Sequence, residues 1–335
     1  MAIYYIGAFP PTYGGVTIKN QYLYQALCDS LPMKKIDMNL VKRGNVRELL
    51  RLLWAMATGR QFVIGLAGQK NRRIFTRLMY CFRRSAMGRS ILLVMGGVVE
   101  DILRAGPEFI RKMDTYRKVY VELPAMAQIL TDAGMTNAAL YPNARPRPAA
   151  PLPVAVGDAA LRCVFFSLIQ PEKGVDRILA AAKQLPGIQF HFYGSIVPGY
   201  RETFLKETDA LANAHYHGTF AGDSESVYRQ LNQYDVLLLP TRWKAEGLPG
   251  ILIEAKIAGL ASVVSAQNHN PQIVHHGRDG IVLEADTDSC LVQALTSLDR
   301  DREVLLNMKL AGIASAEQYY IDTCASQVLN ELQRG

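Results

Sequence analysis

Residues 235–265 read DVLLLPTRWKAEGLPGILIEAKIAGLASVVS. The runs at 235–239 and 261–265 are short, apolar and bounded by turn residues, which is typical of buried strands. Between them a helix can begin at Pro249, because proline is favoured at the first helical position, and Gly259 is well placed to end it. A strand, a helix and a second strand in this order predict a parallel α/β sheet.

The same alternation of short strands and longer helices runs through the whole chain. In the second half, further strands are predicted at residues 163–167, 189–193 and 280–283, with helices at 175–184 and 224–233. In the first half, strands are predicted at 3–6, 62–66 and 91–95, with helices at 16–27, 46–57 and 72–84. The sequence therefore predicts an α/β protein of two Rossmann-like domains that face each other across a cleft.

Length and charge both favour two domains. The chain has 335 residues, and one domain takes about 150. Residues 1–150 carry 22 Lys and Arg against 9 Asp and Glu, whereas the remainder carries 15 against 21. Five prolines between 142 and 153 indicate an extended linker. We expect an amino-terminal domain at 1–143, a linker at 144–160, a carboxyl-terminal domain at 161–315 and a final helix at 316–335 that packs back on the amino-terminal domain.

Composition and spacing exclude several classes of protein. Hydrophobic residues make up 49% of the chain and charged residues 20%, as in ordinary globular proteins. No apolar run approaches the ~18 residues of a membrane span, and the amino terminus lacks the pattern of a signal peptide. The five cysteines have no C-x-x-C spacing, so we expect reduced thiols and a cytoplasmic protein. The loop at 7–15 is not G-x-G-x-x-G, so dinucleotide binding is not expected.

Two glutamates flank a helix start within residues 235–265. Glu246 lies in the loop before the predicted helix and Glu254 in its second turn, at the carboxyl end of a strand, where α/β proteins bind ligands. Free amides and the helix dipole make such a start an anion site. A nucleotide sugar offers a diphosphate to the amides and diols to the carboxylates. The alternative, that both glutamates only cap the helix and face solvent, stays open on spacing alone.

A lysine occupies a similar place earlier in the chain. Lys173 follows the strand at 163–167 and precedes the helix at 175–184. A lysine there can neutralise phosphate charge without a metal. It can equally be a solvated loop residue, because most surface lysines are.

Together these segments resemble the retaining, nucleotide-sugar-dependent glycosyltransferases known as family 4, or group 1, which have the GT-B fold. The pair Glu246-x(7)-Glu254 is the signature of that family. The resemblance continues through P-E-K-G-V-D at 171–176, A-x-x-A-G-L-A-S-V-V-S at 255–265 and I-V-x-x-G-x-x-G at 273–280. It is weaker in the first half, where Gly14-Gly15 before a helix and Tyr141-Pro142-Asn143 match the family.

The resemblance implies a role for each matching residue. Glu246 would contact hydroxyls of the donor sugar, and Glu254 would hold the ribose diol. Lys173 would contact the diphosphate, with help from the backbone at Gly247, Leu248, Pro249 and Gly250. Gly14 and Gly15 would let the opposite loop approach the phosphates closely. Enzymes of this family need no bound metal, so the substrate is a UDP- or GDP-sugar and no cofactor is expected.

Three positions depart from the family pattern. The family usually has an arginine where this chain has Leu168, so Arg242 or Lys244 is expected to substitute. It commonly has a histidine where this chain has Met95. The usual Gly-Gly-x-x-Glu turn is altered to N-H-N-P-Q at 268–272, from which His269 could reach the site or remain a solvated loop histidine. No set of His, Cys and acidic residues has metal-ligand spacing, so no metal site is expected.

The most basic stretch predicts an interaction surface. Residues 42–89 contain twelve Lys or Arg and one acid, Glu48. From Arg72 to Arg84 the apolar residues fall on one helical stripe, namely Ile74, Phe75, Leu78, Met79 and Phe82. A basic amphipathic helix is typical of a protein that docks on an anionic membrane surface. The alternative is a core-packed helix with a solvated basic face. Nucleic acid is not expected as a partner, since no motif accompanies the charge.

These observations give one expected function and two alternatives. We expect a metal-independent retaining transferase that moves a sugar from a nucleoside-diphosphate sugar to a glycan or lipid-linked acceptor in cell-surface polysaccharide synthesis. It would work in the cytoplasm, peripherally on the inner face of the membrane. The alternatives are a sugar-nucleotide epimerase or hydrolase of the same fold, or a non-catalytic sugar-nucleotide-binding partner subunit, which Leu168 and Met95 favour.

Overall fold

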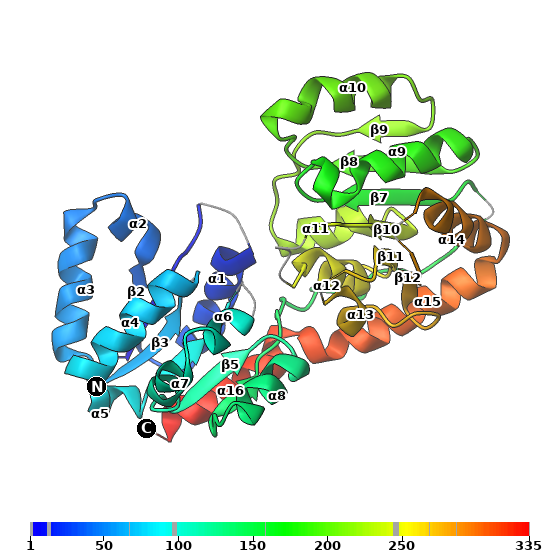
Figure 1. Cartoon of the computed structure of the whole chain (residues 1–335). Helices are drawn as coiled ribbons and strands as arrows, with labels where there is room; N and C mark the ends of the chain where they lie inside the picture. Colours follow the sequence, from blue (N-terminus) through cyan, green and yellow to red (C-terminus); the bar gives the residue numbers. More distant parts are fainter. Residues whose placement is uncertain are drawn as a thin grey trace. The chain divides into compact units, whose positions relative to one another are not determined.

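The computed structural model describes residues 3–11, 15–66, 68–95, 99–157, 159–243, 248–267, 269–285 and 287–334. The chain divides into two compact units (Figure 1). The first comprises 1–146 together with 318–335, and the second comprises 147–317. The boundary after Pro146 falls inside the segment expected as the linker.

The first unit is built on a parallel six-stranded sheet in the order β2-β1-β3-β4-β5-β6. Its strands are β1 (Ile3–Gly7), β2 (Met33–Asp37), β3 (Gln61–Gly65), β4 (Ile91–Leu93), β5 (Lys118–Val121) and β6 (Ala138–Leu140). Its helices are α1 (Gly15–Cys28), α2 (Met38–Lys42), α3 (Val46–Thr58), α4 (Gln69–Phe82), α5 (Arg84–Met87), α6 (Glu100–Leu103), α7 (Pro107–Met113), α8 (Pro124–Asp132) and α16 (Ile321–Gln333).

The second unit has a parallel sheet of the same size, in the order β12-β11-β10-β7-β8-β9. Its strands are β7 (Arg162–Phe166), β8 (Gln189–Tyr193), β9 (Ala214–Tyr216), β10 (Val236–Leu239), β11 (Ala261–Ser265) and β12 (Gly280–Leu283). Its helices are α9 (Val175–Gln184), α10 (Arg201–Asp209), α11 (Ser224–Leu231), α12 (Gly250–Ile257), α13 (Asn270–Ile273), α14 (Asp288–Arg300) and α15 (Arg302–Ala316), with 3₁₀ turns η1 (Pro171–Lys173) and η2 (Pro198–Tyr200). A third 3₁₀ turn, η3 (Glu317–Tyr319), spans the boundary between the units. Both units are therefore Rossmann-like, as the sequence predicts.

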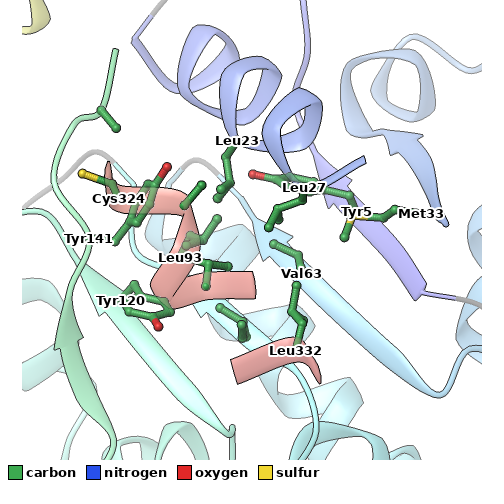
Figure 2. Close-up of a cluster of buried hydrophobic side chains, with 14 of the residues drawn as sticks. Tyr5, Leu23, Leu27, Met33, Val63, Leu93, Tyr120, Tyr141, Cys324 and Leu332 are labelled. Atoms are coloured by element: carbon green, nitrogen blue, oxygen red, sulfur yellow. The ribbon is translucent and has the colours of Figure 1, made fainter. Parts of the chain in front are cut away.

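The last helix of the chain completes the core of the first unit. Side chains of α16 pack with α1 and one face of the first sheet in a single buried cluster, which includes Leu23, Val63, Cys324, Val328 and Leu332 (Figure 2). Burying several such side chains stabilises the unit by about 1.5–3 kcal/mol each. The first unit is thus discontinuous in sequence.

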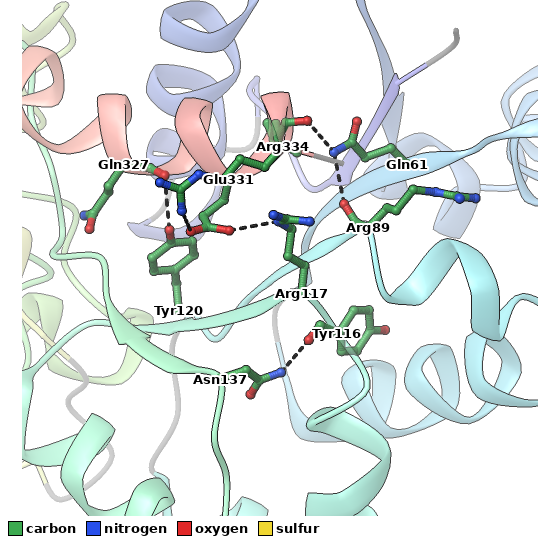
Figure 3. Close-up of polar contacts among 10 residues, drawn as sticks. Gln61, Arg89, Tyr116, Arg117, Tyr120, Asn137, Gln327, Glu331 and Arg334 are labelled. Atoms are coloured by element: carbon green, nitrogen blue, oxygen red, sulfur yellow. Dashed lines mark hydrogen bonds and ion pairs between the residues drawn. The ribbon is translucent and has the colours of Figure 1, made fainter.

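Polar contacts fix the carboxyl-terminal half of the same helix (Figure 3). The Gln61 amide donates to the carbonyl of Leu332 at 2.8 Å, and the Arg117 guanidinium donates to the Glu331 carboxylate at 2.8 Å. Both partners lie more than 200 residues away from α16 in the chain, which places these contacts beyond any local sequence signal.

Candidate functional site

Lys173 lies where two loops of the second unit meet. It ends the 3₁₀ turn η1 after β7, and its side chain is only 5% exposed. Its ammonium nitrogen lies 4.9 Å from the centroid of the Trp243 ring, a cation–π contact with the loop after β10. The lysine is therefore held in place rather than extended into solvent, which is how a preorganised cation is built.

Gly174 allows the two loops to meet. Its φ is +79°, in the left-handed region that glycine adopts most easily. A Cβ at this position would lie 2.1 Å from the carbonyl oxygen of Pro240, at the end of β10. The K-G pair of the family motif thus has a structural explanation: any side chain at residue 174 would push the β10 loop away from Lys173.

Arg242 connects the same two loops through hydrogen bonds. Its backbone N–H donates to the carbonyl of Glu172 at 2.7 Å, and its guanidinium donates to both carboxylate oxygens of Asp176 at 2.9 and 2.8 Å. A third bond reaches the carbonyl of Pro171 at 2.8 Å. Asp176 offsets the charge of Arg242, so the main role of this arginine is to hold the two loops together. Its expected role as a replacement for the arginine missing at Leu168 stays a prediction, and Lys244, the other expected replacement, lies outside the described residues.

The helix after β10 presents the second glutamate. The structure begins α12 at Gly250, with Pro249 as its N-cap residue, one position later than the sequence predicts. Proline offers no hydrogen-bonding side chain to cap the helix, which agrees with an N-terminus suited to an anion. Glu254 lies half-buried in the second turn, and Leu248 is buried just before the helix. Glu246 and Gly247 lie outside the described residues.

A buried ion pair sets the position of α12. The Lys256 ammonium lies 2.7 Å from the Asp279 carboxylate, and both side chains are almost fully buried. Lys256 also donates to the Ser315 hydroxyl at 2.9 Å, and the His275 N–H donates to Asp279 at 2.8 Å. Burial alone would raise the pKa of Asp279, but the hydrogen bonds from Lys256 and His275 outweigh it and lower that pKa. Sequence reasoning missed this pair, because it joins residues far apart in the chain.

His269, in the altered turn, and His276, shortly after α13, make local contacts. His269 precedes α13, and its Nδ1 lies 3.3 Å from the Gln272 amide nitrogen. His276 Nδ1 accepts from the backbone N–H of Val282 at 3.2 Å. Within the described ranges, no group of three His, Cys, Asp or Glu side chains is placed to hold a metal ion. The expected absence of a metal cofactor stays a prediction.

The first unit places a different buried pair at the carboxyl edge of its sheet. Lys19, on the second turn of α1, forms an ion pair with Glu122, which follows β5. Burial, and then the nearby charge of Arg145, lower the pKa of Lys19. No sequence pattern predicts this pair, since a lysine on a helix usually faces solvent. Met95 is buried in the hydrophobic cluster, so the position where the family commonly has a histidine belongs to the core here.

The loop of Gly14 and Gly15 is described only in part. Gly15 begins α1, and a Cβ on it would meet no atom within 4 Å of the described structure. Gly14 lies outside the described residues. In the next turn of α1, the Asn20 amide donates to the carbonyls of Ala8 and Gly65 at 2.9 Å each. Asn20 thereby ties the ends of β1 and β3 to α1.

Comparison with known proteins finds a family model that matches the region of these loops. The family model described as "Glycosyl transferases group 1" matches residues 160–301. A GDP-mannose-dependent alpha-(1-6)-phosphatidylinositol monomannoside mannosyltransferase of Mycobacterium tuberculosis is 30% identical over 190 residues, which cover 51% of this chain and 46% of that protein. The chain thus spans about half the length of the curated relatives it matches.

Two solved structures share the fold over the whole chain. Anabaena Alr3699/HepE in complex with UDP and glucose has a TM-score of 0.74 at 12% identity, with 100% of both chains covered. Sucrose-phosphate synthase from Thermosynechococcus elongatus has a TM-score of 0.72 at 14% identity, covering 100% of this chain and 98% of that one. At these identities the likeness shows the fold alone, which is the pair of Rossmann-like units found in GT-B proteins. Through the match at residues 160–301, the second unit of this chain is similar to the group 1 glycosyltransferases.

Proposed function

We propose that this protein transfers a sugar from a nucleoside-diphosphate sugar to a glycan or lipid-linked acceptor, with retention of the anomeric configuration and without a metal. One observation carries the proposal. In the unit that matches the family, the nearly buried Lys173 ammonium is held at the carboxyl edge of a parallel sheet, where the loops after β7 and β10 meet. A fixed cation at that edge fits a diphosphate.

The chemistry would proceed on one face of the donor sugar. The acceptor oxygen attacks the anomeric carbon while the bond from that carbon to the diphosphate breaks. The departing phosphate oxygen takes the acceptor proton, so no protein nucleophile is needed. Lys173 and the N-terminus of α12 stabilise the charge that grows on the diphosphate, which is the role a metal would otherwise have. Glu246 and Glu254 would orient the sugar and the ribose through their hydroxyls.

Known relatives support the choice of donor and acceptor. The mycobacterial relative is named for GDP-mannose and a phosphatidylinositol mannoside, and the Anabaena structure holds UDP and glucose. We therefore propose a UDP- or GDP-sugar as donor and a saccharide on a lipid or a growing surface polysaccharide as acceptor. Such an acceptor favours a cytoplasmic enzyme that works at the inner face of the membrane.

Calorimetric titration with UDP, GDP, UDP-glucose and GDP-mannose tests the donor site. Tighter binding of one nucleotide family is expected, and transfer assays then use that donor with saccharide acceptors in excess EDTA. Product whose anomeric configuration matches the donor supports a retaining, metal-independent transferase. Turnover without an acceptor would indicate an epimerase or hydrolase, and binding without any turnover would indicate a partner subunit. Full inhibition by EDTA that Mg²⁺ or Mn²⁺ reverses would contradict metal independence.

The role of Glu246 can be tested with the same assay. Glu246→Ala should lower the transfer rate by about 10²–10³, because it removes a contact that strengthens in the transition state. Glu303→Ala, which removes an exposed glutamate from the first turn of α15, is the matched control. Transfer by the Glu246 variant within twofold of the wild-type rate would show that another residue holds the sugar.

A further inference from the structure

Helix α3 of the first unit exposes its apolar face and buries a charged side chain. Five large apolar side chains on it are exposed, with Trp54 at 66%: Val46, Leu49, Leu50, Leu53 and Trp54. Their spacing of three and four residues places them on one face. The charged Glu48 is instead buried, where it accepts hydrogen bonds from the Asp37 N–H and the Arg51 guanidinium, each at 2.7 Å. Scattered exposed leucines need no explanation, but a continuous apolar face on one helix marks an interaction surface.

Helix α4 adds a second exposed row. The sequence predicts that Ile74, Phe75, Leu78, Met79 and Phe82 form a single stripe, but the structure divides it. Phe75 and Met79 are buried, whereas Ile74, Leu78 and Phe82 are exposed, Phe82 at 76%. The exposed three are spaced by four residues, so they form a row along the helix. The stripe is therefore shared between core and surface, because a helix packed on a sheet buries only one side of a stripe this wide.

The two helices lie on the same side of the first sheet. The connections β2-α3-β3 and β3-α4-β4 run in the same direction across the sheet, and right-handed crossovers place both helices on one face. The connection β1-α1-β2 runs the other way, in agreement with the cluster that α1 and α16 form on the opposite face. At the ends of α3 and α4, the Arg83 guanidinium donates to the carbonyl of Gly59, the C-cap residue of α3. The exposed rows therefore end close together.

The charge within the segment that carries these rows is almost entirely of one sign. Residues 42–89 carry twelve Lys or Arg, and their single acid is the buried Glu48. Exposed cations flank both rows: Arg43, Arg47, Arg51, Arg60, Lys70, Arg77 and Arg84. Beside α3 an open groove of about 940 Å³ is lined by apolar residues that include Ile36, Leu50 and Trp54, and by the cations Lys34 and Arg47. Apolar side chains surrounded by cations fit a bilayer surface with anionic headgroups.

We propose that the α3–α4 face, defined by the eight exposed apolar residues of these helices, docks this protein on an anionic membrane, with α3 as the inserted helix. None of the helices among the described residues is long and apolar enough to cross a bilayer. The proposal deepens the proposed function, because it specifies how the enzyme reaches a lipid-linked acceptor. Its test needs no donor and no turnover, so its failure would leave the transferase proposal standing.

Trp54 is a built-in reporter for this docking. The chain has two tryptophans, so Trp243→Phe leaves Trp54 alone. Its fluorescence should shift to shorter wavelength, and acrylamide should quench it less, when phosphatidylcholine vesicles containing phosphatidylglycerol are added. Vesicles of phosphatidylcholine alone should cause neither change. Sedimentation with anionic vesicles and no change in Trp54 emission would overturn the assignment of α3 as the inserted helix.

Matched variants of the full chain separate the helices. Leu50→Ser with Leu53→Ser should weaken sedimentation with anionic vesicles about tenfold or more, since two leucines no longer leave water. Val304→Ser with Leu310→Ser, at exposed positions of α15, is the control and should change nothing. Arg47→Glu should weaken binding to anionic vesicles without removing apolar surface. This variant therefore still tests the proposal if the double serine variant misfolds. Phe82→Ser tests the row on α4 and should have a smaller effect than the α3 pair.

Two results would contradict the proposal. Equal sedimentation with neutral and anionic vesicles, or none with either, would exclude an anionic membrane as the partner. A dimer that shields Trp54 without lipid, and that the double serine variant breaks, would show that a second copy of the chain covers this face instead.

Discussion

At the scale of single residues, the candidate donor site depends on Lys173. The P-E-K-G-V-D motif is enough to predict a cation at this edge of the sheet, but not the fact that Trp243 holds it. The contact between Arg242 and Asp176 was also beyond prediction, because these residues lie 66 positions apart and only the packing of the β7 and β10 loops joins them. Local motifs thus identify candidate ligand-binding residues, whereas the contacts that hold these residues in place come from long-range packing.

Replacing Lys173 tests whether it binds the diphosphate. Lys173→Ala should weaken binding of the nucleoside diphosphate by about 1.5–3 kcal/mol, the usual contribution of a charged hydrogen bond. Titration calorimetry measures this, with Lys183→Ala, an exposed lysine on the same helix-bearing segment, as the control. An unchanged dissociation constant in the Lys173 variant would place the phosphates elsewhere.

Replacing Gly174 tests the contact between the loops. Gly174→Ala should lower the free energy of unfolding of the second unit, because a Cβ would meet the Pro240 carbonyl and φ is positive. Gly277→Ala is a matched control in the same unit, since its φ is +75° but no described atom lies within 4 Å of its Cβ. The control isolates the conformational cost of about 1 kcal/mol. Urea unfolding should show a larger loss for Gly174→Ala, and equal losses would mean that the loops separate freely.

At the scale of elements, apolar periodicity predicted the central strands and missed those without an apolar run. β10 and β11 lie close to their predicted bounds, because both are buried and read as continuous hydrophobic segments. Three strands without an apolar run, β2 (MKKID), β6 (AAL) and β9 (AHY), were not predicted. The buried strand β5 (KVYV) was also not predicted, although its residues favour a strand. α3 was predicted as a helix, but its apolar face is exposed to solvent, which periodicity alone does not reveal.

The paired strands β8 and β9 carry a pH-sensitive cluster. His191 Nδ1 lies 2.9 Å from His217 Nε2, and the His191 and His215 rings are 5.0 Å apart. Burial, followed by the charges of His215, His217 and Arg162, lowers the pKa of His191 to about 4. The folded state therefore resists a proton that the unfolded chain accepts near pH 6.5. The stabilisation that depends on an unprotonated His191 is complete above pH 6.5 and declines as the pH falls toward 4.

Urea unfolding across this range tests that expectation. The free energy of unfolding of the second unit, followed by Trp243 emission in a Trp54→Phe background, should fall between pH 6.5 and 4. His191→Gln should reduce the slope, because the substituted side chain takes up no proton. His269→Gln, which alters a histidine outside the cluster, should leave the slope unchanged. A wild-type slope in the His191 variant would assign the pH dependence to other groups.

At the scale of the whole molecule, the two units differ in how the chain builds them. The second unit is one continuous segment, 147–317, whereas the first needs 318–335 in addition to 1–146. Charge follows the same division, since the basic residues gather in the first half of the sequence. Composition and the proline-rich segment were enough to expect two domains. The buried cluster that joins α16 to α1 depends on tertiary packing that neither feature contains.

Truncation at this division gives opposite predictions for the two units. A fragment of residues 147–317 should unfold cooperatively by itself, because its sheet and helices are complete. A fragment of residues 1–317 should lose the cooperative transition of the first unit. It lacks the buried Cys324, Ala325, Val328 and Leu332, and burial of a large apolar side chain contributes about 1.5–3 kcal/mol.

The loss in the 1–317 fragment should exceed what the first unit can tolerate, because a whole domain is stable by only about 5–15 kcal/mol. It also leaves Gln61 and Arg117 without their partners Leu332 and Glu331 on α16.

Removing residues 334–335 alone is the control and should preserve both transitions, since Arg334 is largely exposed. Calorimetry distinguishes the outcomes. Two intact transitions in the 1–317 fragment would mean that α16 covers an already stable core, and an unfolded 147–317 fragment would mean that the second unit folds only with the first.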